Sequence, residues 1–183
     1  MEKNIKKSIY QNGKISWDYY FMSLAKLSAQ RSKDPNTKVG ACIVNQNYVV
    51  SLGYNGMPKS INCTNANNDL DNDLIFSWEK PAVKEEILNS KYTYVVHAEA
   101  NAIINANLTN SKIGENAIMY ITHMPCFNCA KLIVQSKISR IVYAEDYKND
   151  TEEGKASMLI LEKMGVKIEK INQNFDVILR AHK

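Results

Sequence analysis

The feature that most constrains this chain is the regular alternation of β-rich and helical segments in its second half. Strands are predicted at Ala117–Thr122, Ile138–Ala144 and Val166–Ile171, and helices at Ala98–Ala106, Cys126–Ser136 and Gly154–Met164. Strands joined by helices pair in parallel, because the chain must cross the sheet before it can run in the same direction again. We therefore expect parallel strands in this half, with helices packed against the sheet.

The first half predicts an antiparallel start to the same sheet. Two β-rich runs, Val39–Asn45 and Tyr48–Gly56, are separated only by Gln46 and Asn47, which is the length of a tight hairpin. Before them, Ser16 can cap a helix that ends before the Asp34–Pro35 break. Its apolar face is predicted from residues at helical spacing: Trp17, Tyr20, Phe21, Leu24 and Leu27. The expected fold is α/β, a three-layer α/β/α sandwich around a mixed five-stranded sheet.

The length of the chain suits a single domain, residues 1–183, interrupted by a polar insertion at about 57–92. With 183 residues, of which 45% are hydrophobic, one compact core can form. The insertion is rich in Asn, Asp, Ser and Pro, and we predict loop with one short helix around Ala82–Leu88. A long irregular segment inside a compact domain is uncommon. It is therefore either a lid or partner surface, or a tolerated excursion on the surface.

Charge and hydropathy exclude several classes of protein. The formal net charge is +4 and the basic residues are scattered, so no basic stripe is available to follow a nucleic-acid polymer, whereas a small anionic ligand fits such a charge. No run of about 18 apolar residues can span a membrane, and the N-terminus lacks the apolar stretch of a signal peptide. A cytoplasmic location is the expectation. Four cysteines are too few for a disulfide scaffold.

Cys126 and Cys129 form a Cys-x-x-Cys pair after Pro125, at the start of a predicted helix. Both sulfurs then lie on one side of the first turn, where free backbone N–H groups and the helix dipole favour thiolates. Taken alone, the pair is compatible with two zinc ligands, with redox chemistry or with half of a four-cysteine zinc site. Because Cys42 and Cys63 are far apart in the sequence, a closed four-cysteine site is disfavoured.

His97 is the expected third zinc ligand, and Glu99 stands two residues beyond it. Both the histidine and the cysteine pair follow strand-to-helix turns, which gather at the carboxyl ends of the strands. Three protein ligands leave the fourth zinc position for water, and Glu99 could exchange protons with that water. His-x-Glu followed by Pro-Cys-x-x-Cys is the signature of zinc-dependent nucleobase deaminases. His123 is the rival ligand, although no glutamate stands two residues after it.

With these residues in view, the chain resembles the deoxycytidylate deaminase family from about Trp17 to Ile171. The similar blocks are "RSKDPNTKVGACIVN", "GYNGMP", "KYTYVVHAEANAI", "CAKLIVQSKI" and "MGV". The resemblance implies a cytidine deaminase-like fold and hydrolysis of dCMP to dUMP and ammonia, which supplies dUMP for thymidylate synthesis. It implies that zinc-bound hydroxide attacks the base, that Glu99 shuttles the proton, and that His97, Cys126 and Cys129 hold the metal.

The resemblance also implies a substrate site and an effector site. Asn55 matches an asparagine that contacts the base or sugar, while Thr37 and Tyr147 are weaker substrate candidates. The loop containing Gly53, Tyr54 and Gly56 is similar to the region that binds effectors in the family. The open alternatives are core packing for Tyr54 and turns with positive φ for the two glycines. The resemblance further implies hexamers, activation by dCTP with Mg²⁺, and inhibition by dTTP.

Two departures from the family pattern and two rival functions accompany this interpretation. His123 and Met124 stand where the family more often has a small or Leu residue and an aromatic one, and Tyr147 follows Asp146 directly.

One rival function is another deaminase of the superfamily, acting on a nucleoside, nucleobase or RNA. The other is a non-catalytic, zinc-stabilised module that binds nucleotides.

Overall fold

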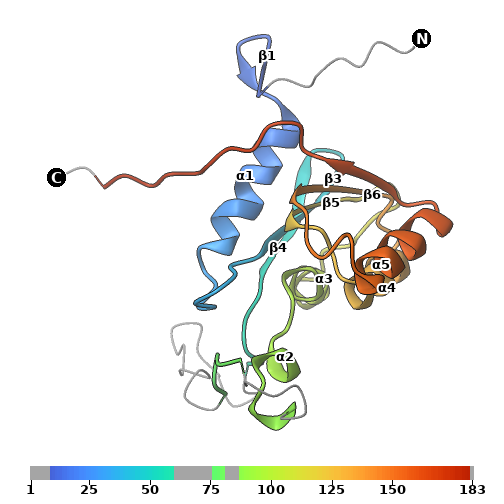
Figure 1. Cartoon of the computed structure of the whole chain (residues 1–183). Coiled ribbons are helices and arrows are strands. Elements are labelled where there is room, and N and C mark those ends of the chain that lie inside the picture. Colours follow the sequence, from blue (N-terminus) through green and yellow to red (C-terminus); the bar gives the residue numbers. More distant parts are fainter. Residues whose placement is uncertain (1–8, 60–75, 81–86, 182–183) are drawn as a thin grey trace.

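The computed structural model describes residues 9–59, 76–80 and 87–181, and its centre is one five-stranded sheet. The strands are β3 (Gly40–Asn45), β4 (Tyr48–Tyr54), β5 (Ile118–His123), β6 (Arg140–Glu145) and β7 (Lys167–Lys170). They lie in the order β4-β3-β5-β6-β7 (Figure 1). β3 pairs antiparallel with β4 and β5, and β5, β6 and β7 pair in parallel. The predicted mixed sheet is confirmed.

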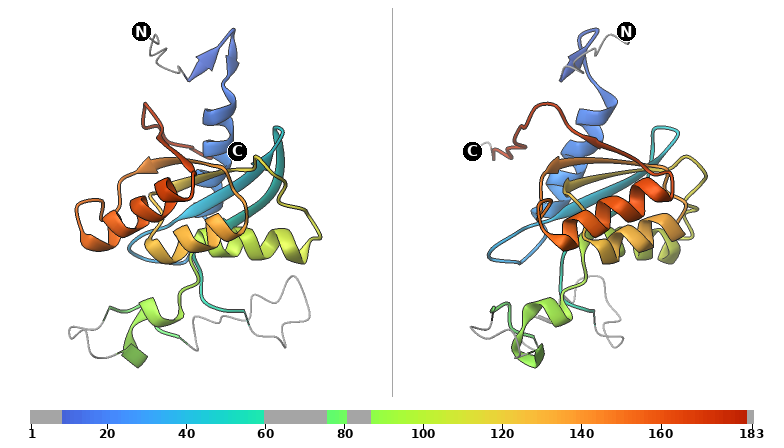
Figure 2. Two further views of the ribbon diagram at one scale, coloured as in Figure 1. Left: turned by 90° about the vertical axis from the view of Figure 1, so that its right-hand side faces the viewer. Right: turned by 45° about the vertical axis from the view of Figure 1, so that its right-hand side comes forward.

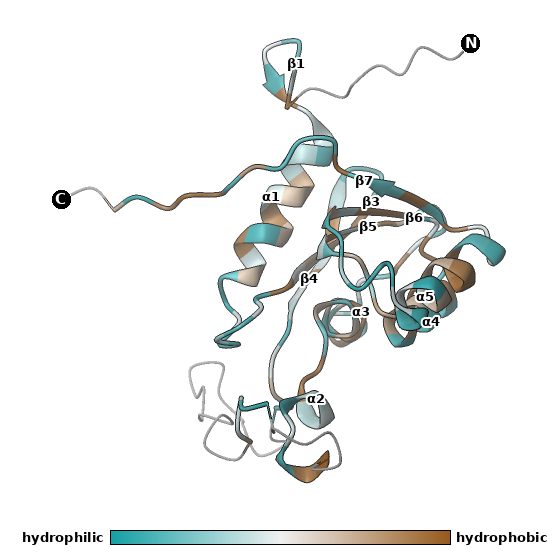
Figure 3. Ribbon diagram, in the orientation of Figure 1, coloured by the Kyte–Doolittle hydropathy of each residue, from teal (hydrophilic) through white to brown (hydrophobic). Residues whose placement is uncertain are grey.

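Helices cover both faces of this sheet. α1 (Trp17–Ala29) lies on one face, whereas α3 (Ala98–Leu108), α4 (Phe127–Gln135) and α5 (Glu152–Lys163) lie side by side on the other (Figures 1 and 2). Successive strand residues point to opposite faces: Ile43 and Ile121 pack towards α3–α5, while Cys42 and Tyr120 pack towards α1. The inner strands are accordingly hydrophobic along their length (Figure 3). The predicted three-layer sandwich is confirmed.

The hairpin between β3 and β4 has the predicted two-residue turn. Asn45 pairs with Tyr48, and the turn residues Gln46 and Asn47 have φ values of 49° and 66°. Positive φ at both central residues is the mark of a type I′ turn, whose twist matches that of the strands. The turn therefore fixes the antiparallel pairing of β4 with β3.

The face of α1 that packs on the sheet agrees only in part with the predicted one: Phe21 is buried and Leu24 packs against the same cluster as β3 and β5. Of the predicted stripe, Trp17, Tyr20 and Leu27 are exposed, and the sheet is instead contacted by a buried set: Tyr19, Phe21, Met22, Ala25, Ser28 and Ala29. The reason is close approach, because a Cβ on Gly40 would meet the carbonyl oxygen of Ala25 at 2.0 Å. Small residues must therefore face β3, and the bulky aromatic residues lie beside the contact.

Two short strands precede α1. β1 (Tyr10–Gln11) and β2 (Lys14–Ile15) form a hairpin that the sequence interpretation missed. Its signal is the Asn12–Gly13 pair, whose φ values of 51° and 74° suit a type I′ turn.

Part of the predicted insertion at about 57–92 lies outside the described residues, and so does most of the short helix expected around Ala82–Leu88. The described part holds a 3₁₀ turn, η2 (Ile87–Asn89), and α2 (Lys91–Tyr94), which Figure 1 shows apart from the three-layer body. Among the described helices, none combines the length and the apolar character needed to cross a membrane.

Candidate metal centre

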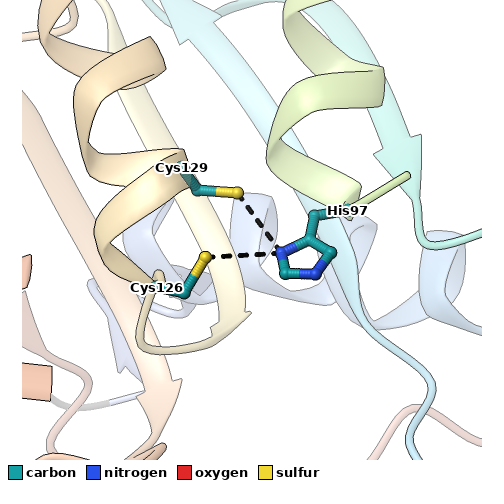
Figure 4. Close-up of side chains that lie close together, drawn as sticks. All are labelled: His97, Cys126 and Cys129. Atoms are coloured by element: carbon teal, nitrogen blue, oxygen red, sulfur yellow. Dashed lines mark hydrogen bonds between the residues drawn. The ribbon is translucent and has the colours of Figure 1, made fainter. Parts of the chain in front are cut away.

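Three side chains predicted as zinc ligands converge between α3 and α4. The Nδ1 atom of His97 lies 3.5 Å from the Sγ atom of Cys126 and 3.4 Å from that of Cys129 (Figure 4). Within the described part of the chain, these residues form the one group of three or more potential ligands whose donor atoms all lie within 4.8 Å of one another. The sequence prediction of this cluster agrees with the geometry.

The cluster arises because two helices begin at the same edge of the sheet. His97 is the N-cap of α3 and Cys126 is the N-cap of α4, and neither side chain makes a capping hydrogen bond. Ser, Thr, Asp and Asn are the preferred residues at this position. The two side chains instead point towards each other, and Cys129 joins them from the first turn of α4 (Figure 4).

The spacing of the donor atoms fits a zinc ion. Zinc bonds to sulfur at about 2.3 Å and to imidazole nitrogen at about 2.0 Å, so tetrahedral angles put an N and an S ligand about 3.5 Å apart. The two measured N–S separations are 3.5 and 3.4 Å. Two thiolates and one imidazole leave a fourth tetrahedral position for a non-protein ligand, which is typical of catalytic zinc sites.

The alternatives involving other residues do not reach this cluster. Cys42 is fully buried on the α1 face of the sheet, where burial raises the pKa of its thiol to about 12. His123 lies 3.0 Å through Nδ1 from Thr122 Oγ1 and 3.3 Å through Nε2 from Glu145 Oε2, and it is not part of the ligand group. Cys63 lies outside the described residues.

Glu99 lies beside the ligands but is not one of them. It belongs to the first turn of α3, is 4% exposed and lines the same cavity as His97 and Cys126. Burial raises the pKa of its carboxyl group, and this effect outweighs the opposing attraction of His97. A carboxyl group with a raised pKa exchanges protons more readily near neutral pH, which suits a general acid/base.

The two thiols differ in their readiness to ionise. The hydrogen bond from Cys129 and, after the opposing effect of burial, the bond with His97 lower the pKa of Cys126 to about 3. The same sulfur–sulfur contact, with burial and the nearby Glu99 charge, raises the pKa of Cys129. The bond to Cys126 raises the pKa of His97. Without metal, the cluster therefore favours a Cys126 thiolate beside an imidazolium.

Neighbouring backbone contacts hold both ligand-bearing helices in place. At Gly53 of β4, an added Cβ would meet the Ala98 carbonyl oxygen at 2.3 Å and the Ala102 nitrogen at 2.4 Å, so α3 lies directly on the strand. The buried Ser157 of α5 donates a 2.7 Å hydrogen bond to the carbonyl oxygen of Pro125. These contacts fix the starts of α3 and α4, and with them the ligands.

The cavity next to the metal cluster gathers the predicted substrate residues. Thr37, Asn55 and Tyr147 all line it, together with His97 and Glu99. The amide oxygen of Asn55 accepts a 2.8 Å bond from Val39 N, and its amide nitrogen donates to Thr37 O at 3.0 Å. The Tyr147 ring meets the His123 ring edge-on, with centroids 6.5 Å apart. Direct contact of these residues with a substrate stays a prediction.

The residues predicted to bind an effector divide into two groups. Tyr54 and Gly56 line a second cavity of about 360 Å³, whereas Gly53 lines neither cavity and serves the approach of α3. The alternative explanation by positive φ is wrong for both glycines, because within the described chain only Gly13 and Gly165 have positive φ among the glycines. Tyr54 is half-buried, and its role in effector binding stays a prediction beside the alternative of core packing.

Three residues of the first cavity were missed as site residues by the sequence interpretation. Asp34 was taken as a helix break and as part of a similar block, Lys91 as part of another block, and His123 as a rival ligand and a departure from the family pattern, yet all three line the cavity. Their signals are weak: Lys91 is the one charged residue between Ser90 and Val96, directly before the His97 helix. A single buried lysine cannot be told from a surface lysine by sequence alone.

Comparison with known proteins gives a consistent family assignment. The family model described as "Cytidine and deoxycytidylate deaminase zinc-binding region" matches residues 15–145. The chain is 44% identical over 157 residues to deoxycytidylate deaminase of Homo sapiens, covering 85% of this chain and 80% of that protein. It is 42% identical over 163 residues to a probable deoxycytidylate deaminase of Drosophila melanogaster, covering 85% and 72%.

A solved structure has the same fold. The dCMP deaminase of the cyanophage S-TIM5, in complex with dCMP and dUMP, is 25% identical and superposes with a TM-score of 0.61. The comparison covers 82% of this chain and 93% of that one. The expected cytidine deaminase-like fold is therefore confirmed.

Proposed function

Since the chain belongs to the cytidine and deoxycytidylate deaminase family, we propose that it hydrolyses dCMP to dUMP and ammonia and so supplies dUMP for thymidylate synthesis. That it is a deaminase follows from its membership and from the 44% identity to a deoxycytidylate deaminase. The observation that carries the proposal is the cluster of His97, Cys126 and Cys129 beside a cavity that is lined by His97, Cys126 and Glu99.

The chain's own residues would act on the base as follows. A zinc ion, when bound, supplies Lewis-acid activation of a water molecule. Glu99 would take one proton from the attacking water and pass it to N3 of the cytosine ring. It would then take the remaining proton of the new hydroxyl group at C4 and pass it to the amine, so that ammonia leaves as the C4 carbonyl forms. His97 and the two cysteines hold the metal and compensate its charge.

The walls of the cavity would orient the nucleotide. Asn55 is 5% exposed and has its amide held on both sides, so it offers a fixed group to the base or sugar. Thr37 lies on the loop before β3, and Tyr147 follows β6 with its ring against His123. Fixed groups of this kind lower the entropy cost of bringing C4 to the nucleophile.

We further propose that the second cavity takes the effectors, dCTP with Mg²⁺ as activator and dTTP as inhibitor. It is lined by Tyr54 and Gly56 and by three cationic side chains, Arg31, Lys33 and Lys59, which suit a triphosphate. Asn55 lines both cavities, so the two ligands would lie against one shared side chain. Assembly into a homo-oligomer, a hexamer by resemblance, and a cytoplasmic location belong to the same proposal.

The test is ammonia release from purified, zinc-loaded protein. The substrates are dCMP, CMP, deoxycytidine and a short cytosine-containing oligonucleotide, each with and without dCTP and Mg²⁺ and with dTTP in a third arm. We expect dCMP to be turned over much faster than the other three, with dCTP raising and dTTP lowering the rate. If dCMP is inert while zinc is bound, the substrate proposal is wrong. If dCMP reacts but neither nucleotide changes the rate, only the effector proposal fails.

A further inference from the structure

A buried ion pair stands in the wall of the substrate cavity, apart from the metal cluster. Lys91 Nζ lies 2.8 Å from Asp34 Oδ1 and 2.6 Å from Oδ2, and each side chain is 4% exposed. Asp34 comes from the loop after α1 and Lys91 from α2, 57 residues later, and both line the cavity. The pair therefore joins two segments that are far apart in the sequence.

The carboxylate of Asp34 is fully occupied within the protein. Besides Lys91, its Oδ1 atom accepts hydrogen bonds from the backbone amides of Asn36 at 2.8 Å and Thr37 at 3.1 Å. Its Oδ2 atom accepts a bond from the side-chain amide of Asn55 at 3.3 Å. A carboxylate offers about four lone-pair sites, so no acceptor remains for a ligand. Its contacts serve to hold the neighbouring residues.

The residues held by Asp34 are those predicted to meet the substrate. Thr37 is bound through its amide, and Asn55 through its side chain. Asn55 in turn accepts from Val39 N, so the loop from Asp34 to Val39 and the end of β4 are fastened to each other. Asn55 also lines the second cavity. The ion pair is thus the anchor of the wall that the two cavities share.

The pKa of Asp34 shows that the buried pair stays charged. Burial alone would raise the pKa of Asp34, but the bond from Lys91 and the two backbone amides outweigh it and hold that pKa below its usual value. The carboxylate stays charged at neutral pH. Buried ion pairs stabilise a fold little or not at all compared with apolar side chains of the same volume. Stability alone therefore does not account for a pair at this place.

We propose that Asp34 and Lys91 are positioning residues for the nucleotide substrate. The pair keeps Thr37 and Asn55 at fixed places relative to the metal cluster, so that the sugar and base enter against a preformed wall. Neither residue donates a group to the reaction itself. The inference rests on the proposed function, because it names the residues that shape the site for dCMP.

The test compares Lys91→Met with Lys91→Arg and with the matched surface variant Lys163→Met, which changes an exposed lysine of α5. We expect Lys91→Met to raise KM for dCMP about tenfold with kcat within about threefold of wild type and unchanged zinc content, and Lys91→Arg to recover most of the affinity. Hydrogen exchange at the amides of Asn36, Thr37 and Val39 should become faster in Lys91→Met only.

A second variant covers the case in which Lys91→Met does not fold because Asp34 is left as an unpaired buried charge. Asp34→Asn/Lys91→Met removes both charges and keeps an amide oxygen for Asn36 and Thr37, and it should fold while its KM stays raised. A lowered melting temperature with unchanged KM and unchanged exchange would overturn the inference and leave the pair purely structural. If wild type fails to turn over dCMP, the proposed function falls and the positioning of this substrate falls with it. Faster exchange in Lys91→Met would then support only the ordering of the loop by the ion pair, and unchanged exchange would refute that as well.

Discussion

At the scale of single residues, two of the metal ligands occupy helix N-cap positions, where a capping side chain is usually found. His97 and Cys126 begin α3 and α4 without capping them, so each helix start forgoes a stabilisation of about 1 kcal/mol. The metal ligands therefore carry a local cost in stability. Glu99, in the first turn of α3, is the acidic group beside these ligands.

The role of Glu99 can be separated from metal binding. Glu99→Gln keeps the size of the side chain but cannot accept a proton, so turnover should fall by about 10³-fold while zinc remains bound. Turnover is measured as ammonia release, and zinc content by elemental analysis. Glu115→Gln, which changes an exposed carboxylate outside both cavities, is the control and should match wild type. Full activity of Glu99→Gln with zinc bound would contradict the proton-transfer role.

His123 is a titratable group of the cavity wall that takes no part in metal binding. Because the Glu145 carboxylate can only accept a hydrogen bond, Nε2 carries the proton, and Nδ1 accepts from the Thr122 hydroxyl. Burial lowers the pKa of His123, Glu145 raises it and Lys26 of α1 lowers it further, with a net decrease. The folded protein thus favours the neutral ring.

This shift predicts a pH dependence of stability. An unfolded histidine has a pKa of about 6.5, so as the pH falls below that value the unfolded chain binds a proton that the folded chain refuses. The contribution of His123 to the free energy of unfolding is present above pH 6.5 and is lost as the pH falls towards the folded pKa. In urea unfolding at pH 7.5 and pH 5, His123→Leu should lose less stability on acidification than wild type. Equal losses in the two proteins would refute the prediction.

At the scale of elements, two glycines set how closely the helices approach the sheet. Gly40 of β3 lies against the backbone of α1, and Gly53 of β4 lies against the backbone of α3. A side chain at either place would push a whole helix outwards. The two positions are equivalent in packing but not in function, because α3 carries His97 and Glu99 whereas α1 carries no residue that lines the first cavity.

Gly40→Ala and Gly53→Ala form a matched pair of variants. Both should lower the free energy of unfolding by about 1–3 kcal/mol, since each forces atoms into a filled space. Only Gly53→Ala should also weaken zinc binding, because it displaces the start of α3. Urea unfolding measures the first effect, and competition with a coloured chelator measures the second. Equal zinc affinity in the two variants would show that α3 can shift without disturbing its ligands.

Some parts of the fold and of the site could be predicted from the sequence, whereas others depend on contacts that form only when the chain folds. Strand and helix positions follow from periodicity, and the metal site follows from His97, Glu99 and the cysteine pair, because their chemistry requires a fixed spacing. The predicted face of α1 was wrong at Trp17 and Tyr20, because apolar patterning favours these residues whereas contact with Gly40 selects Ala25 and Ala29. Asp34 and Lys91 escaped prediction because their pairing exists only after folding.

At the scale of the whole molecule, the two edges of the sheet differ in character. β7 presents Lys167, Glu169 and Lys170, which is the usual protection of an edge against further pairing. β4 has no charged residue and exposes Tyr48, Val49 and Leu52 to 76%, 44% and 40%. An apolar edge beside exposed side chains of α3 is the kind of surface that oligomers cover.

We therefore expect the β4 edge to lie in the contact between copies of the proposed homo-oligomer. Val49→Lys should shift the protein to a smaller species in size-exclusion chromatography with light scattering. Leu159→Lys replaces a more exposed apolar residue on α5 and is the control, which should keep the wild-type mass. An unchanged mass for Val49→Lys would place the contact elsewhere.

The position of the metal ligands has a consequence for handling the protein. The donors sit on separate helices, 29 and 32 residues apart along the chain, so a bound ion is a removable cross-link that closes a loop of that length. A protein stock that slowly loses zinc would therefore first lose catalytic activity. Afterwards the protein would unfold at a higher rate, so its half-life would shorten. Its absorbance would stay constant throughout, and the ratio of metal to protein would be the true measure of its shelf life.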